Sequence, residues 1–356
     1  MEFKEFKQEV AARCQAQGIA DYELFYQASE STSVSVFQHE VKQFTSSIDG
    51  GVCFRCIVNG KMGYASTEDL SREQADAIVA RAVDNASVLE SEEPVFLGEG
   101  GKVYAVLEET PWEEVSPETL IARTLATQEA LYASDSRVVD GCETQGVVEK
   151  SRVAICNSRG LDLEESTSLS ALVVASVVSD GTEMSDSYEI KLGNLSEIDS
   201  AELCKKATGD AIRKLGGDVA PTGQYPVVFA PDAMCDLLAT FCSIFNSENA
   251  QKGMSRLLGK EGEKIAAPVV TLLDDPFCKA SPNRSAFDAE GSPTAKKAII
   301  ENGELKTLLY NLKTAAVAGR QTTGNASKSG YDSPVGIRPF TLYLAPGEIT
   351  EEALLK

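Results

Sequence analysis

The chain of 356 residues contains a single histidine, His39, and this limits the chemistry that it can carry. A zinc hydrolase with an H-E-x-x-H motif needs two imidazoles on one helix face, and a Ser-His-Asp or Cys-His site needs one beside its nucleophile. One histidine excludes the first kind of site. His39 lies in an alternating polar and apolar run, Val34 to Val41, which predicts a hairpin bend. We therefore interpret His39 as a turn residue rather than a catalytic group.

Cysteines form two patterns that need a structural interpretation. Cys53 and Cys56 have the spacing of a redox or zinc pair, but their surroundings predict a strand. Residues three apart on a strand point to opposite faces, so the two sulfurs cannot easily reach one ion or each other. Cys235 and Cys242 lie seven apart on a predicted helix, on a face with leucines and phenylalanines, and core packing accounts for them.

Two loops carry polar residues that could bind ions. The run Gly319 to Lys328 has glycines like a phosphate loop, but Asn325 stands where the Walker pattern requires lysine, and no helical period follows. Nucleotide binding is therefore not predicted. Asp288 and Glu290 offer two carboxylates to a hard cation, yet an acidic turn is the favoured interpretation.

Composition bounds the class of protein. With 43% hydrophobic residues the chain can form ordinary cores, and no segment reaches the roughly 20 apolar residues that span a bilayer. The charged N-terminus does not resemble a signal peptide, and nine cysteines favour reduced thiols, so we expect a cytoplasmic protein. The net charge of −21, from 54 acidic and 33 basic residues, opposes direct contact with nucleic acid or an anionic membrane.

Hydrophobic periodicity predicts alternating helices and short antiparallel strands. Predicted helices cover 1–17, 71–87, 117–133, 198–215 and 231–245. Predicted strands cover 24–26, 34–36, 41–48, 52–58, 138–150, 152–157, 161–179, 225–230, 269–273 and 340–344. Asp49-Gly50-Gly51 is expected to separate two strands, and Asn59-Gly60 predicts a type I′ hairpin turn. Ser71 is the expected N-cap of the second helix.

These elements predict an α+β fold with antiparallel sheets flanked by helices. Glycines and a proline between 91 and 111 indicate a linker. We expect an N-terminal α+β domain at 1–92, a central α+β domain at 110–217 and a mixed C-terminal domain at 222–356.

The residue order in several segments resembles that of the TldD/PmbA family, and specifically its PmbA (TldE) branch. The resemblance is carried by residues 50–66 (GGVCFRCIVNGKMGYAS), 247–255 (SENAQKGMS), 285–294 (SAFDAEGSPT), 300–311 (IENGELKTLLYN) and 319–326 (GRQTTGNA). It covers roughly residues 20–345. Each segment alone is weakly specific, and together they are specific.

The resemblance implies a cytosolic metallopeptidase system, also named a modulator of DNA gyrase. One subunit type carries H-E-x-x-x-H and the metal, and the PmbA type lacks these ligands. The two are thought to form a hollow dimer that takes in unfolded peptides. Alignment with the motif places Leu238, Ala239 and Ser243 at its two histidines and glutamate, so none can bind zinc or act as a base. Family members continue past Lys356, so we expect a truncated or degenerate member.

Our hypothesis is a non-catalytic subunit that binds unfolded peptide, needs no metal or cofactor, and pairs with a TldD-type subunit or with itself. Its candidate peptide-binding residues, each with a capping or turn role as the alternative, are Ser247, Glu248, Asn249, Gln251, Lys252, Arg320, Thr323 and Asn325. One alternative is a self-associating peptide-binding scaffold without a peptidase partner. Another is an independent hydrolase that uses Asp288, Glu290 or a cysteine, namely Cys235, Cys242 or Cys278.

Overall fold

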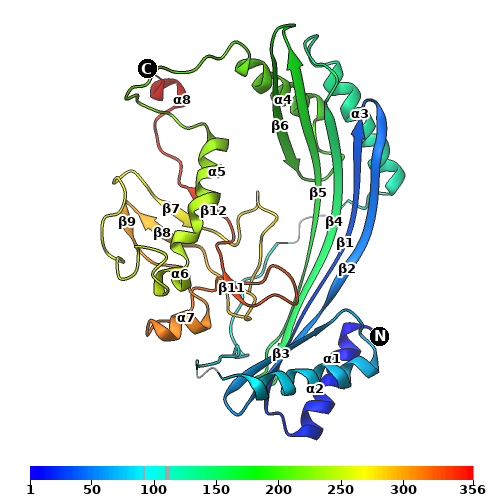
Figure 1. Ribbon diagram of the computed structural model, residues 1–356, viewed down its shortest axis with the longest axis vertical. Helices are drawn as coiled ribbons and strands as arrows, with labels where there is room; N and C mark the ends of the chain where they lie inside the picture. The colour runs from blue at the N-terminus through cyan, green and yellow to red at the C-terminus, as the bar shows by residue number, and fades with distance from the viewer. Residues whose placement is uncertain (91–92, 109–112, 356) are drawn as a thin grey trace.

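The computed structural model describes residues 1–90, 93–108 and 113–355, and shows one large sheet with a smaller C-terminal unit beside it. The sheet is long and curved, and the C-terminal unit faces its concave side (Figure 1). Two N-terminal helices cover one end of the sheet, and two later helices cover the other. The predicted α+β class with antiparallel sheets is confirmed.

Hairpins build the first half of the large sheet. The chain begins with α1 (Phe3–Gln17), β1 (Asp21–Phe37), β2 (Glu40–Val58), β3 (Lys61–Thr67) and α2 (Arg72–Val88). Gln38 and His39, with φ of 50° and 66°, form the first turn, and Asn59 and Gly60, with φ of 52° and 76°, form the second. Both turns lie where the sequence predicts them, and Ser71 caps α2 as expected.

β1 and β2 are longer than the sequence predicts, because the expected breaks do not occur. Asp49, Gly50 and Gly51 lie inside β2, where β1 provides a partner at each position, such as Gln27 opposite Gly51. This ladder of backbone hydrogen bonds overrides the local turn preference of the glycines. A Cβ at Gly51 would lie 2.6 Å from the ring of Tyr331, so glycine there also lets the C-terminal unit approach closely.

The second half of the sheet joins the first edge to edge. It contains α3 (Pro117–Tyr132), β4 (Glu143–Asn157), β5 (Asp162–Ser179), β6 (Met184–Leu192) and α4 (Ser200–Lys214). The strand order is β3-β2-β1-β4-β5-β6, and β4 pairs with β1 from Glu23 opposite Asn157 to Phe37 opposite Glu143. One sheet therefore runs through the predicted N-terminal and central domains, whose boundaries at 92 and 110 remain a prediction.

The two faces of the sheet bury different cores. On the outer face, Leu24, Phe54 and Cys56 pack against α1 and α2. A second core on this face, which includes Val34, lies beneath α3 and α4. On the concave face, Cys53 packs with aromatic and aliphatic side chains next to the C-terminal unit. Cys53 and Cys56 thus lie on opposite faces, as predicted, and cannot share a metal ion.

Short elements form the C-terminal unit. They are α5 (Pro231–Phe241), the 3₁₀ helix η1 (Cys242–Phe245), α6 (Ser247–Gln251), β7 (Leu272–Asp274), β8 (Lys297–Glu301), β9 (Glu304–Leu305), α7 (Leu312–Val317), β10 (Ala326–Ser327), β11 (Gly336–Ile337), β12 (Leu342–Leu344) and α8 (Glu351–Leu354). Four strands form an antiparallel sheet in the order β12-β7-β8-β9, and β10 pairs with β11. None of the described helices is long and apolar enough to cross a bilayer.

The predicted strand at 225–230 is wrong. These residues pair with no other segment that the structure describes, and Val227 and Phe229 are exposed. The apolar run reads as a strand, but a strand needs a neighbour for its backbone hydrogen bonds, and the sequence of one segment cannot show whether a neighbour exists.

Contacts between distant segments fix the C-terminal unit against the sheet. Phe287 packs with Phe25 in the concave-face core, and the Tyr331 hydroxyl lies 3.1 Å from a carboxylate oxygen of Glu68. The linker takes part, because the Tyr104 hydroxyl donates to the carbonyl of Gly291 at 2.9 Å. Residues of both units are therefore held close enough to line a shared cavity.

Candidate functional site

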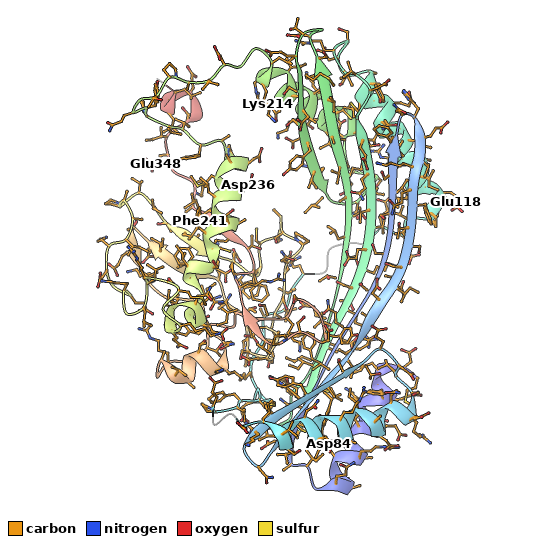
Figure 2. The ribbon with its side chains drawn as sticks, in the orientation of Figure 1. Asp84, Glu118, Lys214, Asp236, Phe241 and Glu348 are labelled. Atoms are coloured by element: carbon orange, nitrogen blue, oxygen red, sulfur yellow. The ribbon has the colours of Figure 1, made fainter. Side chains whose placement is uncertain are left out.

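The positions that the sequence aligns with the metal motif lie on α5, for Leu238 and Ala239, and on the 3₁₀ helix η1 that follows it, for Ser243. Leu238 packs partly against the C-terminal core, whereas Ala239 and Ser243 are exposed. Asp236 and Phe241 lie on the same helix (Figure 2). Apolar residues and the first-turn proline explain why this segment is helical. α5 presents a leucine and an alanine methyl group, and η1 a hydroxyl, where two imidazoles and a carboxylate would be needed.

His39 lies in the turn between β1 and β2. Its Nδ1 is 2.7 Å from Oε1 of Glu129, and its ring stacks on Tyr132 with 4.4 Å between centroids. The backbone N–H of His39 donates to the side chain of Gln128. These contacts give His39 a turn-fixing role, in agreement with the prediction.

The predicted peptide-binding residues after α5 have mixed environments. Ser247 is 1% exposed and donates to Thr314 Oγ1 at 2.8 Å, so it cannot contact a peptide, and a buried hydrogen bond replaces the predicted role. Gln251 donates to the backbone carbonyl of Thr314. Glu248 and Lys252 form an ion pair of 2.7 Å and remain accessible. Asn249 donates to the carbonyl of Ser243.

The glycine-rich loop uses most of its polar groups internally. Asn325 is fully buried and donates to Oδ2 of Asp274 at 2.8 Å, so its predicted place at a peptide surface is wrong. Thr323 exchanges hydrogen bonds with the backbone of Tyr310. Arg320 pairs with Glu261 at 3.2 Å and remains exposed. Burial explains both corrections, because Ser247 and Asn325 satisfy other buried polar groups.

Asp288 and Glu290 are both buried, but they have different hydrogen-bond partners. Asp288 accepts hydrogen bonds from the backbone N–H groups of Glu290, Ser292 and Ala326, which makes it the anchor of a turn. Glu290 accepts from the backbone of Leu312. Burial raises the pKa of Asp288 to about 6 and that of Glu290 to about 7. The turn interpretation agrees with this geometry, and the two carboxylates line separate cavities.

The three candidate nucleophilic thiols are dispersed. Cys235 is exposed on α5, Cys242 donates to the carbonyl of Ala239, and Cys278 lies in the loop after β7. None lies next to His39, which pairs with Glu129 beside α3. None of these three thiols therefore forms a cysteine-histidine pair of the protease type with His39.

A cavity of about 240 Å³ lies between the concave face of the sheet and the C-terminal unit. Its sheet side consists of neighbouring side chains from β1, β4 and β5, for example Gln27, Val153 and Glu165, which stand opposite one another in register. Its other side includes Lys328 and Arg338 from segments around β10 and β11. Sequence reasoning missed this site, because its residues become neighbours only when the two units pack together.

Comparison with protein families matches three consecutive segments of the chain. Profiles described as PmbA/TldA metallopeptidase domain 1, central domain and C-terminal domain match residues 22–86, 110–215 and 222–356. The chain belongs to the PmbA/TldD metallopeptidase family. The family resemblance in the sequence is thereby confirmed.

Known structures and relatives agree with this membership. The crystal structure of a putative modulator of a DNA gyrase from Thermotoga maritima matches this chain with a TM-score of 0.90 and 30% sequence identity. The match covers 100% of this chain and 80% of that one. TldE from Thermococcus kodakarensis is 22% identical with a TM-score of 0.83, covering 98% and 79%, and shows the fold alone. A metalloprotease from Methanothermobacter thermautotrophicus is 28% identical over 341 residues, covering 92% and 72%.

Membership in a PmbA/TldD metallopeptidase family implies a metal, so the donor set of this chain needs a test. Among residues 1–90, 93–108 and 113–355, no group of three or more His, Cys, Asp or Glu side chains is arranged to hold an ion. At the motif positions, Leu238 and Ala239 have no donor atom and Ser243 has only a hydroxyl. The residues at these three positions do not fit the metal.

Proposed function

We propose that this PmbA/TldD family chain is a non-catalytic subunit of a metallopeptidase assembly and binds unfolded peptides for a catalytic partner. The observation that carries the proposal is that Leu238 and Ala239 on α5, with Ser243 on η1, occupy the aligned motif positions in a chain whose fold is that of the family. The helix is retained, and the groups that a metal and a general base require are replaced.

The concave face of the sheet supports a role in peptide binding. Along β1, Ser29, Ser31 and Ser33 share this face with Phe25, and Ser151 on β4 lies 2.6 Å from Thr167 on β5 between their hydroxyl oxygens. Hydroxyl groups can bind main-chain amides without selecting a side chain. An extended peptide can also add to an open sheet edge through its backbone, which gives affinity with little sequence preference.

Some of the predicted residues remain part of the proposal. Glu248 lines a second cavity of about 330 Å³ together with Lys313 and Arg55. Lys252 and Arg320 are accessible charged groups at the same C-terminal unit. A contact between any of these side chains and a peptide is proposed here, whereas buried Ser247 and Asn325 act through the support of neighbouring loops.

We propose that the partner is a TldD-type chain with the H-E-x-x-x-H motif, and that the two form a dimer. Relatives that match this chain include proteins named metalloprotease TldD homolog and metalloprotease PmbA homolog. The nine cysteines are free thiols, which favours a reducing compartment, so the proposal places the assembly in the cytoplasm.

Reconstitution with purified proteins tests the proposal. An unfolded peptide is incubated with this chain alone, with a TldD-type chain alone, and with both. We expect no cleavage by this chain, chelator-sensitive cleavage with the TldD-type chain, and a higher rate or a lower KM when the two are mixed. Chelator-sensitive cleavage by this chain alone would contradict the proposal. A partner chain whose motif histidines are replaced by alanine controls for contaminating peptidases.

Self-association is a second candidate, because β6 has an open outer edge. Met184, Tyr188 and Ile190 alternate along it with exposed fractions of 66%, 64% and 52%. An exposed apolar edge strand is a template for pairing with another chain. In this alternative the same strand joins two copies, and the peptide is bound without a peptidase partner.

A further inference from the structure

Lys328 is the feature of the cavity between sheet and C-terminal unit that internal packing does not explain. Its ammonium group lies 5.0 Å from the centroid of the Phe25 ring, at the base of the cavity, and beside the Cys53 thiol. A cation over an aromatic face gains some electrostatic attraction. The side chain of Lys328 is partly buried, so this ammonium has lost part of its hydration.

No carboxylate of the described chain forms an ion pair with this ammonium group, although the more distant Glu23 carboxylate favours its charged form. Within the part of the chain that the structure describes, no carboxylate oxygen lies within 4.0 Å of the Lys328 ammonium or of the Arg338 guanidinium. Burial lowers the pKa of Lys328 and the neighbouring Arg55 guanidinium lowers it further, while the Cys53 sulfur and the Glu23 carboxylate offset only part of this effect. Buried charges in proteins are normally paired with an opposite charge, so a cavity-lining cation whose contacts are a thiol and an aromatic ring, with no ion pair, indicates a missing anion.

The carboxylates that line the same cavity are already engaged. Glu165, across the cavity on β5, accepts a hydrogen bond from the hydroxyl of Ser285, and burial raises its pKa. Asp288 accepts three backbone N–H groups of its own turn. Two strand spacings, about 10 Å, separate β1 beneath Lys328 from β5. The cations Lys328 and Arg338 are therefore left to act on a ligand.

The size and the lining of the cavity restrict what that ligand can be. A volume of about 240 Å³ is smaller than the range of roughly 300–1,000 Å³ that is typical of whole small-molecule sites. It suits one or two residues of a longer chain. Gln27, Ser151 and Thr167 offer amide and hydroxyl groups to a main chain. The net charge of the protein is −21, so most of its surface repels anions, and a cavity with a local excess of cations is a place where an anion can bind.

We propose that this cavity is a subsite for a carboxylate of an extended peptide, with Lys328 and Arg338 as its cationic contacts. The carboxylate is either the C-terminus of the peptide or an acidic side chain near it. This inference rests on the proposed peptide-binding function and adds the chemical group that the chain selects. The sheet residues hold the preceding main chain, and the lysine and arginine neutralise the carboxylate.

Binding of a labelled peptide of Gly, Ser and Ala residues to the full chain tests the subsite. The same peptide is compared with a free C-terminus, with an amidated C-terminus, and amidated with one glutamate near the end. We expect amidation to weaken binding to the wild-type chain about tenfold, since a charge-assisted contact is lost. If glutamate restores binding, the subsite accepts any carboxylate; if it does not, the subsite recognises the C-terminus.

Variants connect the effect to the cavity. Lys328→Met keeps the side chain packed over Phe25. It should weaken binding of the free-carboxylate peptide about tenfold and leave binding of the amidated peptide unchanged. The losses of affinity from amidation and from the substitution are then not additive. Arg338→Gln should act in the same direction. Lys328→Arg keeps the charge and should retain the preference for a carboxylate, which separates charge from folding. Lys306→Met is the control, because Lys306 already pairs with Glu304 at the surface.

The outcomes separate the two proposals. If peptides bind and neither amidation nor Lys328→Met changes the affinity, the carboxylate subsite is wrong and the peptide-binding function stands. If no peptide binds to the wild-type chain at all, the peptide-binding function fails, and the subsite fails with it.

Discussion

At the scale of single residues, buried carboxylates distinguish a structural role from a catalytic one. Asp288 has a raised pKa, as an active-site acid often has, but its oxygens are occupied by backbone donors of its own turn. Glu290 has a raised pKa because it is buried and close to Asp288. The hydrogen-bond partners show that Asp288 organises the loop that closes the cavity beside Lys328.

Glu290 makes folding stability depend on pH. Its pKa is about 7 in the folded chain against an ordinary value of 4.5, so the folded state keeps a proton that the unfolded state releases. The stabilisation from this group is therefore complete below about pH 4.5 and is lost as the pH rises through 7. Glu290→Gln keeps an acceptor for Leu312 and removes the titration.

Chemical unfolding of both proteins between pH 4.5 and 8 measures this effect. The stability of the wild type relative to Glu290→Gln should fall as the pH rises, by roughly 3 kcal/mol at most over the whole interval. Parallel pH profiles for the two proteins would show that Glu290 does not titrate in this range.

At the scale of elements, close packing between α2 and β3 depends on a glycine. A Cβ at Gly63 would lie 1.9 Å from the carbonyl oxygen of Ala82 and 2.9 Å from the Cβ of Ala86. The helix must therefore move away from the strand when this position carries a side chain. Such overpacking typically costs about 1–3 kcal/mol.

Gly63→Ala should accordingly lower the free energy of unfolding by about 1–3 kcal/mol, measured by denaturant unfolding. Gly209→Ala is a matched control inside α4, because a Cβ there meets no atom within 4 Å. Helix propensity should make this control more stable by about 0.5–1 kcal/mol. Equal effects of the two substitutions would contradict the packing argument.

Local signals predicted many of these elements. Asn59-Gly60 determines its turn through positive φ angles, Ser71 caps its helix, and the separation of Cys53 from Cys56 follows from strand alternation. The errors come from partners that the local sequence does not contain. Asp49 to Gly51 stay in a strand because β1 pairs with them, and residues 225–230 are not a strand because nothing described pairs with them.

At the scale of the whole molecule, the candidate site could be predicted only in part. The family follows from contiguous segments of the sequence, and these segments also give the alignment on which the proposed replacement of the metal motif rests. The cavity does not, because Phe25 and Lys328 lie in different units and meet only through tertiary packing. Ser247 and Asn325 were selected as polar residues of loops, and a polar pattern does not reveal whether a loop folds inward.

The open edge of β6 gives a prediction about assembly. If self-association uses this edge, Ile190→Lys should shift the protein from dimer to monomer in analytical ultracentrifugation, because a charge on an edge strand opposes pairing. Val88→Lys is the control, since Val88 is 76% exposed at the end of α2, away from β6. A dimer that survives Ile190→Lys would place the interface elsewhere.

The central position of β1 also constrains how the protein is made. β1 pairs with β2 on one side and β4 on the other, and Glu23 finds its partner Asn157 only after the ribosome has added more than a hundred further residues. Until then, one side of β1 exposes unpaired backbone groups in the nascent polypeptide. Synthesis of this sheet therefore includes a period in which the unpaired side of β1 is open to pairing with other chains.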